Sequence, residues 1–174
     1  ITSSRLNDLL IFDYNMNPLW GYHFDYPITS LSIGDIESDG LKEILLGTNK
    51  KLIVFTKDGF KLKEYSFDSD VRTAIAFKDE FNTSFILIGK DNILYAYDWD
   101  KEIFNHKFDG NVNLIQYDNL DYKNQIEIIT GTSDGVYILD TNGKRLFTYR
   151  TYSPIINVFT INLDFKGHKE LIIA

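Results

Sequence analysis

Four short apolar runs, each ending in a small residue, recur along this chain at a nearly fixed interval. The runs end at Gly47, Gly89, Gly131 and Ala174, so the successive steps are 42, 42 and 43 residues. A fixed period of this length is typical of chains that stack copies of one supersecondary unit. The period therefore constrains the fold more tightly than any single motif does.

Each unit carries further segments in the same phase. A second apolar run follows each first one, at residues 52–55, 94–97, 136–139 and, near the start, 9–12. A turn comes next, marked by the hairpin dipeptides Asp58-Gly59 and Asn142-Gly143, with Lys101 and Asn17 expected at the position of Gly59. Ile, Val, Tyr, Phe and Thr are common and no 3.6-residue apolar period appears, so each unit is predicted to contain four strands.

Four-stranded units of about 42 residues predict an all-β fold, a β-propeller of four-stranded antiparallel blades. The two middle strands of each unit are near-continuous apolar runs, which indicates that both of their faces are covered by neighbouring blades. An irregular β-sandwich is the other architecture that the strands allow, but a sandwich does not require a fixed period.

The repeat predicts one propeller domain over residues 1–174, with one blade divided between the termini. The expected parts are 1–27 (outer strands of the divided blade), 28–70, 71–110 and 111–153 (whole blades), and 154–174 (inner strands of the divided blade).

Strand Leu9–Phe12 is expected to pair antiparallel with strand Leu171–Ala174, because two bare apolar edges promote aggregation. Pairing within one chain gives a four-bladed monomer, and pairing between two chains gives a homodimer that closes an eight-bladed ring. Residues 1–5 are expected to supply slack for this joint. A third reading, favoured by the missing initial Met, is an excerpt of a larger propeller.

Composition restricts the function. The net charge is −7, and the densest basic cluster is Lys50-Lys51 with Lys61 and Lys63 nearby, so nucleic acid is not an expected partner. No apolar run approaches the roughly 18 residues of a membrane span. The chain contains no Cys, which excludes disulfides and favours a cytoplasmic location.

One loop between the first and second strands of a unit is rich in carboxylates. Its candidate calcium ligands are Asp35, Glu37, Asp39, the backbone carbonyl of Leu41, and Glu43. In this segment the chain resembles the FG-GAP and VCBS-type propeller repeats, whose loops read roughly D-x-D-x-D-G-x-x-D/E. It is also similar to the propellers of the Bardet-Biedl ciliary coat subunits and of integrin-α-like intracellular proteins. A solvated acidic turn without metal is the other interpretation of the loop.

The equivalent loops depart from the calcium pattern. Lys123 and Lys166 stand where Asp39 stands, and the unit that begins at Val71 has lost the loop. We expect Lys123 to pair with Asp121 and Glu127. We likewise expect Lys166 to pair with Asp164 and Glu170, so that both loops close without an ion.

No catalytic motif is recognisable, so the chain is predicted not to be an enzyme and to need no cofactor except, in one reading, calcium. The three His residues lie at different blade positions and are not expected to converge on a metal. Trp99, flanked by Asp98 and Asp100 in a turn, is a candidate partner-binding residue, because exposed aromatic side chains often anchor partners. The other interpretation has its ring folded over its own hairpin. Trp20 is expected to pack between blades.

The sequence therefore predicts a non-catalytic scaffold that binds a protein partner, with an acidic surface suited to basic patches. A calcium-stabilised adhesion or ligand-binding propeller is the first alternative. An enzyme with a pocket on the propeller axis is the second.

Overall fold

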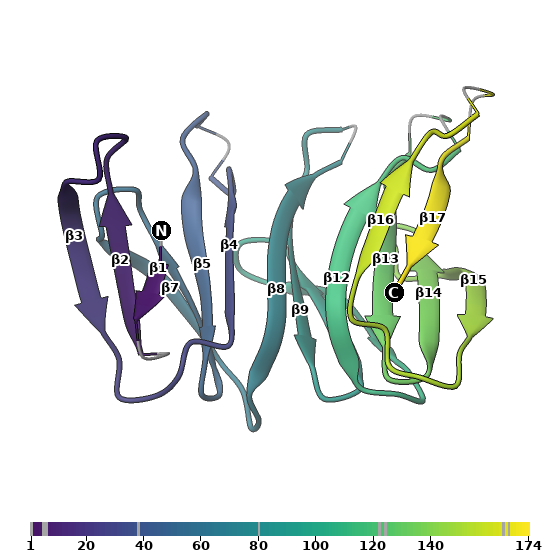
Figure 1. The fold of residues 1–174 in the computed structure, drawn as a ribbon, viewed down its shortest axis with the longest axis horizontal. Coiled ribbons are helices and arrows are strands. Elements are labelled where there is room, and N and C mark those ends of the chain that lie inside the picture. Colours follow the sequence, from purple (N-terminus) through teal and green to yellow (C-terminus); the bar gives the residue numbers. More distant parts are fainter. Residues whose placement is uncertain are drawn as a thin grey trace.

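The described residues fold into small antiparallel sheets that stand side by side in an arc (Figure 1). The computed structural model describes residues 2–4, 7–37, 39–79, 81–121, 123, 125–164, 166 and 168–174. Strands account for all of the regular secondary structure in these ranges. The all-β propeller fold expected from the repeat is confirmed.

Three of the sheets are complete four-stranded blades. The first blade has the order β4-β5-β6-β7, with bounds Ser30–Gly34, Glu43–Thr48, Lys51–Phe55 and Lys61–Ser66. The second blade contains β8 (Val71–Lys78), β9 (Ser84–Lys90), β10 (Ile93–Tyr97) and β11 (Glu102–Lys107). The third contains β12 (Val112–Asp118), β13 (Glu127–Thr132), β14 (Gly135–Leu139) and β15 (Arg145–Arg150).

Two smaller sheets flank the blades. The N-terminal sheet has the order β1-β2-β3, with bounds Thr2–Ser4, Asp8–Phe12 and Pro18–His23. The C-terminal sheet pairs β16 (Val158–Ile161) with β17 (Glu170–Ile173). They lie at opposite ends of the arc (Figure 1).

The expected pairing of Leu9–Phe12 with Leu171–Ala174 inside one chain is therefore wrong. Among the described strands β17 pairs with β16, and β2 pairs with β1 and β3. The arc does not bend far enough to bring its two ends together. Residues expected to be slack instead form β1, in which Thr2 stands opposite Leu10.

The apolar core lies between neighbouring sheets rather than inside any one of them. Alternate residues of one strand face opposite neighbours: Leu46 contacts the cluster shared with the N-terminal sheet, whereas Leu45 contacts the cluster shared with the second blade. All residues of β5, β13 and β14 are buried. This arrangement explains the continuous apolar runs, since both faces of a middle strand need apolar side chains.

The hairpin turns between the third and fourth strands follow one pattern in three of the sheets. Gly59 and Gly143 adopt φ values of +88° and +80°, a left-handed conformation in which glycine avoids the Cβ clash. In the N-terminal sheet this conformation belongs to Met16 (φ +65°), not to Asn17. The expected alignment of Asn17 with Gly59 is therefore wrong by one residue. The step between these two units is 43, as the alignment of Leu9 with Leu52 also requires.

The second blade has a shorter turn, in which the N–H of Asp98 donates to the carbonyl of Lys101. The expected alignment of Lys101 with Gly59 is therefore also wrong.

Candidate functional site

The carboxylate-rich loop between β4 and β5 is held by its own backbone and by one lysine. Glu43 is only 3% exposed, and its Oε2 accepts hydrogen bonds from the N–H of Ile36 (2.7 Å) and of Glu37 (3.4 Å). Asp39 Oδ1 accepts from the N–H of Leu41 at 2.8 Å. The side chain of Glu37 is exposed.

Asp35 is the carboxylate of this loop that pairs with a neighbouring blade. Its Oδ2 lies 2.7 Å from Nζ of Lys78, at the end of β8. It also accepts from the N–H of Gly40 at 3.3 Å. The ammonium of Lys78 thus occupies the side of Asp35 that faces the second blade.

The same backbone bond recurs in the two equivalent loops. Glu127 accepts from the N–H of Leu120 at 2.9 Å, and Glu170 accepts from the N–H of Leu163 at 2.8 Å. The glutamate that ends each of these loops therefore closes it by capping a backbone N–H seven residues earlier. This repeated bond gives a structural reason for the glutamate that does not involve metal.

The candidate calcium ligands do not converge in this arrangement. Within the described residues, no group of three or more His, Cys, Asp or Glu side chains is placed to hold a metal ion. Calcium needs six to eight oxygens around one point. Calcium binding by Asp35, Glu37, Asp39, Leu41 and Glu43 stays a prediction.

The lysines of the other two loops pair with one of their two expected partners. Lys123 Nζ lies 2.6 Å from Asp121 Oδ2, and Lys166 Nζ lies 3.1 Å from Asp164 Oδ2. These two ion pairs are confirmed. Glu127 and Glu170 form no ion pair with these lysines, because their carboxylates cap the backbone instead.

Of the two interpretations of Trp99, the structure does not favour a freely exposed ring. The ring is half-buried and packs against the cluster between the first and second blades. Lys63 Nζ lies 5.0 Å from the centre of the ring and 2.8 Å from Asp100 Oδ1. Asp98 accepts hydrogen bonds from two backbone N–H groups of its own turn. Trp99 and Asp100 therefore contact the preceding blade through Lys63, whereas Asp98 stabilises its own turn. A role of Trp99, Asp98 and Asp100 in partner binding stays a prediction.

Trp20 joins blades in the same way, as expected. Its Nε1 donates to the carbonyl of Lys57 at 2.8 Å, and its ring covers Gly59, where any Cβ would clash with it. Tyr65 likewise donates to the carbonyl of Trp99 at 2.8 Å. Lys57 and Trp99 occupy equivalent turn positions. A fourth-strand side chain that docks on the next turn is thus a repeated element of this fold.

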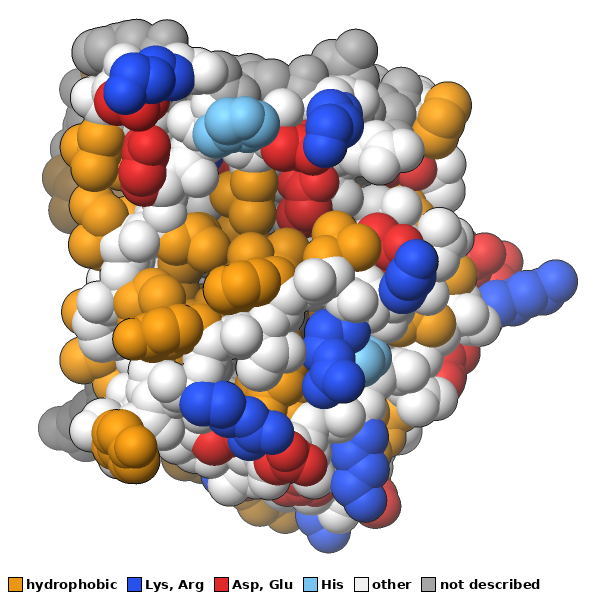
Figure 2. Space-filling model, turned by 90° about the vertical axis from the view of Figure 1, so that its right-hand side faces the viewer, with side chains coloured by type: hydrophobic (Ala, Val, Ile, Leu, Met, Phe, Trp, Pro, Cys, Tyr) orange, Lys and Arg blue, Asp and Glu red, His pale blue; other side chains and the backbone are white. Residues whose placement is uncertain are grey.

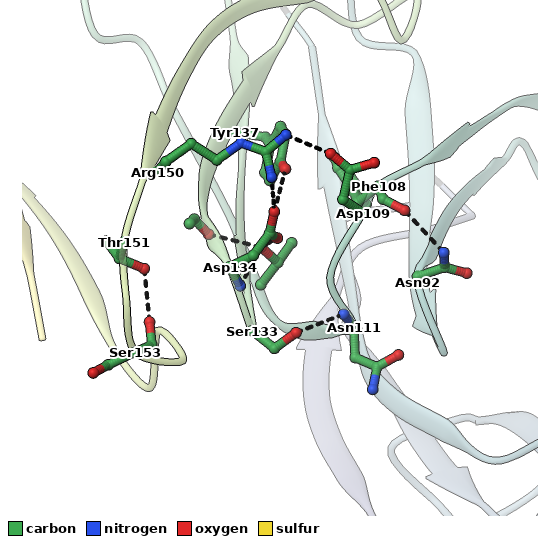
Figure 3. Close-up of polar contacts among 12 residues, drawn as sticks. Asn92, Phe108, Asp109, Asn111, Ser133, Asp134, Tyr137, Arg150, Thr151 and Ser153 are labelled. Carbon is green, nitrogen blue, oxygen red and sulfur yellow. Dashed lines mark hydrogen bonds and ion pairs between the residues drawn. The ribbon is translucent and has the colours of Figure 1, made fainter.

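A polar network ties the second blade to the third (Figure 3). The guanidinium of Arg150 lies between Asp109 and Asp134 and forms an ion pair with each. Asp134 also accepts from the hydroxyls of Thr132 (2.6 Å) and Tyr137 (2.8 Å). Tyr137 is 1% exposed, so its hydroxyl needs such a partner.

These contacts shift two pKa values in opposite directions. Burial acts to raise the pKa of Asp134, but hydrogen bonds from Thr132 and Tyr137 and the charge of Arg150 outweigh it, so the pKa lies below its ordinary value. Burial, together with the hydrogen bond to Asp134, raises the pKa of Tyr137 to about 12. At neutral pH, Asp134 and Arg150 are therefore charged and the phenol of Tyr137 keeps its proton, so all of these hydrogen bonds and ion pairs can form.

A groove lies at the outer rim, between β3 and the first blade. Its volume is about 480 Å³. Buried Phe24 and Phe55 lie at its base, and Tyr22 (49% exposed) and Tyr26 (54% exposed) stand at its wall. The rings of Tyr22 and Phe24 are 4.6 Å apart between centroids.

The other side of this groove is charged. Glu64 lies between two lysines, 2.6 Å from Lys51 Nζ and 3.3 Å from Lys61 Nζ. The hydrogen bond from Lys51 is the main cause of the lowered pKa of Glu64. Lys50 and Asp25 complete the charged lining.

Sequence reasoning missed this groove, although it noted Lys50, Lys51 and Lys61 as the densest basic cluster. The aromatic wall comes from β3 and the segment that follows it, and the lysines come from β6, β7 and the turn before β6, so the site exists only where two sheets meet. The local signal was the pair of tyrosines that flank Phe24.

A shallower hollow of about 410 Å³ lies at the ends of the inner strands. Thr29, Asp70, Val71, Arg72 and Asn113 line it. Its one carboxylate and one guanidinium offer no acid–base pair backed by a third group, which a catalytic reading would need. The described part of the chain contains no helix of the length and apolarity needed to cross a bilayer.

No family model matches the chain, and no curated protein matches its sequence. Solved structures do match. Sqt1 of Saccharomyces cerevisiae superposes with a TM-score of 0.79 at 15% identity over 97% of this chain. The BBS1 propeller, solved in complex with ARL6, has a TM-score of 0.74 at 11% identity over 98%. BamB of Moraxella catarrhalis has a TM-score of 0.64 at 17% identity over 93%.

Identities this low establish the fold and nothing finer, and the fold is that of propellers. This chain spans 56%, 51% and 48% of the BBS1, Sqt1 and BamB chains, about half of each. The closer resemblance to FG-GAP and VCBS repeats stays a prediction, as does the cytoplasmic location.

Proposed function

We propose that this protein is a non-catalytic interaction module that binds a segment of a protein partner in the groove between β3 and the first blade. The observation that carries the proposal is Tyr22, a half-exposed aromatic ring held on a rigid base of Phe24 and Phe55. Tyrosines in such settings supply large contact area at low entropic cost, and they are common at binding hot spots.

The groove also specifies the chemistry of its partner. Its lining has three lysines and two carboxylates, Asp25 and Glu64, so it is locally positive on a chain whose net charge is −7. A segment with an apolar or aromatic side chain next to acidic residues complements it. This assignment replaces the expected basic partner of an acidic surface. The BBS1 structure with ARL6 offers an analogy of fold for a protein partner.

Selection from a displayed library of random peptides tests this proposal. We expect enrichment of peptides that combine acidic and aromatic residues. Their affinity should fall at least tenfold, or about 1.4 kcal/mol, in Tyr22→Ala. It should also weaken as salt concentration rises, because lysines contribute.

Phe81→Ala is the matched control, since Phe81 is 80% exposed on a turn of the second blade and does not line the groove. Peptides that bind Tyr22→Ala as tightly as the parent protein would contradict the proposal. So would a library that yields no binder.

A further inference from the structure

One dipeptide recurs at the outer rim of three junctions between neighbouring sheets. Phe24-Asp25, Phe67-Asp68 and Phe108-Asp109 each follow directly after an outer strand, which is β3, β7 or β11. The N–H of each phenylalanine donates to a carbonyl in a turn of its own sheet, at 2.9, 2.7 and 2.8 Å. Because these backbones are held alike, the three junctions can be compared position by position.

Two of these junctions contain a tyrosine of the next blade. The rings of Phe67 and Tyr95 are 5.9 Å apart between centroids, and those of Phe108 and Tyr137 are 4.7 Å apart. Both tyrosines lie in the third strand of their blade, at equivalent positions of its pairing with the middle strand. In each junction the tyrosine ring therefore packs on the phenylalanine of the dipeptide.

A long cationic side chain completes the same two junctions. Lys90 forms an ion pair with Asp68, and its Nζ lies 5.7 Å from the centre of the Tyr95 ring. In the next junction Arg150 pairs with the equivalent aspartate, and its Cζ lies 5.8 Å from the centre of the equivalent tyrosine ring. A ring and a cation thus fill the space that borders each of these two dipeptides.

The junction between the N-terminal sheet and the first blade has shorter side chains at all of these positions. Ile53 stands where the two tyrosines stand. Thr48 stands in place of Lys90, and Ser66 stands in place of Arg150. Ile53 and Thr48 line the groove. This junction is therefore open where the other two are filled.

Trp20 adds a further departure, because it changes the surroundings of Tyr22. Tyr65, the equivalent of Tyr22 in the first blade, donates its hydroxyl to the carbonyl of Trp99 at 2.8 Å and is 8% exposed. In the open junction the indole of Trp20 donates to the equivalent carbonyl, that of Lys57. Tyr22 is left 49% exposed on the wall of the groove.

The groove also differs from the apolar surface at the C-terminal end of the arc. That end is apolar across its centre, with charged side chains around it (Figure 2). It is the outer face of the last described sheet, whereas both walls of the groove belong to described sheets. The shape of the groove is therefore set by residues within this part of the chain.

We propose that the groove accepts one aromatic side chain of the partner segment. The ring lies on Phe24 and Ile53, beside Tyr22, in the place that Tyr95 and Tyr137 take in the two filled junctions. This inference rests on the proposed function and names the anchor that the groove binds. Departures from the repeat at several positions meet in this one junction and leave a space bordered by aromatic rings, which suits an aromatic guest.

The charges beside this space describe the neighbours of the ring. Lys50 occupies the turn position of Asp134, because both carbonyls accept the N–H that follows the fourth strand. Asp134 accepts the hydroxyl of Tyr137, whereas the ammonium of Lys50 is a donor and favours an acceptor, such as a carboxylate of the segment. Asp25 in turn favours a basic residue on its side of the ring, since cations bind its two equivalents.

A free aromatic probe tests the assignment on the parent protein. The probe is N-acetyl-tyrosinamide, and its control is N-acetyl-leucinamide, which has an apolar side chain without a ring. In NMR spectra of methyl-labelled protein, the ring protons of the tyrosine probe should show nuclear Overhauser effects to a methyl group of Ile53. The Ile53→Leu variant identifies that methyl signal by losing it. A tyrosine probe without this contact at millimolar concentration, or a leucine probe with an equal contact, overturns the inference.

Filling the groove from within provides the second test. Ile53→Tyr should place a ring where Tyr95 and Tyr137 have theirs, and it should weaken binding of the tyrosine probe at least tenfold. Its melting temperature should not fall, because the larger side chain enters existing space, whereas overpacking of a closed core is destabilising. Ile53→Leu conserves volume and should bind the probe as the parent protein does. Unchanged binding by Ile53→Tyr, or a lowered melting temperature, overturns the inference.

The inference and the proposed function fail in distinguishable ways. Displayed peptides that depend on Tyr22 but still bind Ile53→Tyr would support the proposed function and overturn the assignment of the ring. A tyrosine probe in contact with Ile53, together with a library that yields no binder, would support the ring site and contradict the proposed function.

Discussion

At the residue scale, Asp134 is the carboxylate that joins three strands of the third blade, because it bonds to Thr132 in β13, Tyr137 in β14 and Arg150 in β15. Asp134→Asn removes the charge that pairs with Arg150 and weakens the acceptor for Tyr137 and Thr132. Hydrogen bonds to charged groups contribute about 1.5–3 kcal/mol, and we expect a loss in this range at neutral pH. Chemical denaturation measures it. Asp109→Asn is the control and should cost less, because Asp109 is 74% exposed and pairs with Arg150 at the surface.

The same substitution has a pH signature. The folded pKa of Asp134 lies below its ordinary value of 3.8, so its ionised form is favoured in the fold. The contribution of ionised Asp134 to the free energy of unfolding is complete above pH 3.8 and is lost as the pH falls through the lower pKa of the folded state. The melting temperatures of the parent protein and Asp134→Asn should therefore converge below pH 3.8. A constant difference down to the acid limit would refute this assignment.

Glu43 provides a second prediction at this scale. Glu43→Ala removes the acceptor of the Ile36 N–H in a buried setting, and an unsatisfied buried donor costs about 1–3 kcal/mol. Glu170→Ala removes the equivalent bond in a more exposed loop, where water replaces it, and should cost less. Urea denaturation of the two variants compares them. Equal losses of stability in the two variants would show that the burial of Glu43 does not determine the cost of removing its hydrogen bond.

At the scale of elements, the turn that carries Trp99 stabilises the contact between the first and second blades. Trp99→Ala should lower stability by about 2 kcal/mol, less than the about 3–5 kcal/mol of a fully buried Trp, because the ring is half-buried. Trp99→Phe should recover part of the loss by keeping the ring beneath Lys63. Thermal melts compare the variants. A Trp99→Ala protein as stable as its parent would instead restore Trp99 as a free surface residue.

The loop between β4 and β5 offers the test of calcium. An ion bound to the carboxylate oxygens of Asp35 must compete with Lys78. Binding to the native state raises the melting temperature by mass action. If the loop is a calcium site, millimolar calcium should raise the melting temperature of the parent protein but not that of Asp39→Ala. An unchanged melting curve would rule out calcium binding by this loop.

At the scale of the whole molecule, the protection of backbone amides against hydrogen exchange should decrease from the middle of the arc to its ends. The strands of the second and third blades are covered on both faces, whereas β16 and β17 form a two-stranded sheet with one bare face. Two-stranded sheets are marginally stable alone. Hydrogen exchange should be fastest in β1, β16 and β17 and slowest in β9 and β13. Uniform protection along the chain would contradict the gradient.

The sequence by itself determined the repeat, the strand content and the position of most strands. It did so because a middle strand buried on both faces must be apolar along its whole length, and glycine marks turns that need a left-handed backbone. For that reason the strands at Leu52–Phe55 and Val136–Leu139 could be predicted from the sequence. The ion pairs Lys123–Asp121 and Lys166–Asp164 were also predictable, since each joins residues two apart.

Tertiary structure alone decided whatever depends on how one sheet meets the next. Whether Trp99 is exposed depends on Lys63 and Tyr65 of the preceding blade, which lie more than thirty residues away. The role of Glu43 as a backbone cap, and the pairing of Asp35 with Lys78, depend on loop geometry that spacing does not specify. The groove exists only between β3 and the first blade. Closure within one chain failed as a prediction because it depends on the curvature of the arc, which is the sum of small rotations between blades that no local pattern encodes.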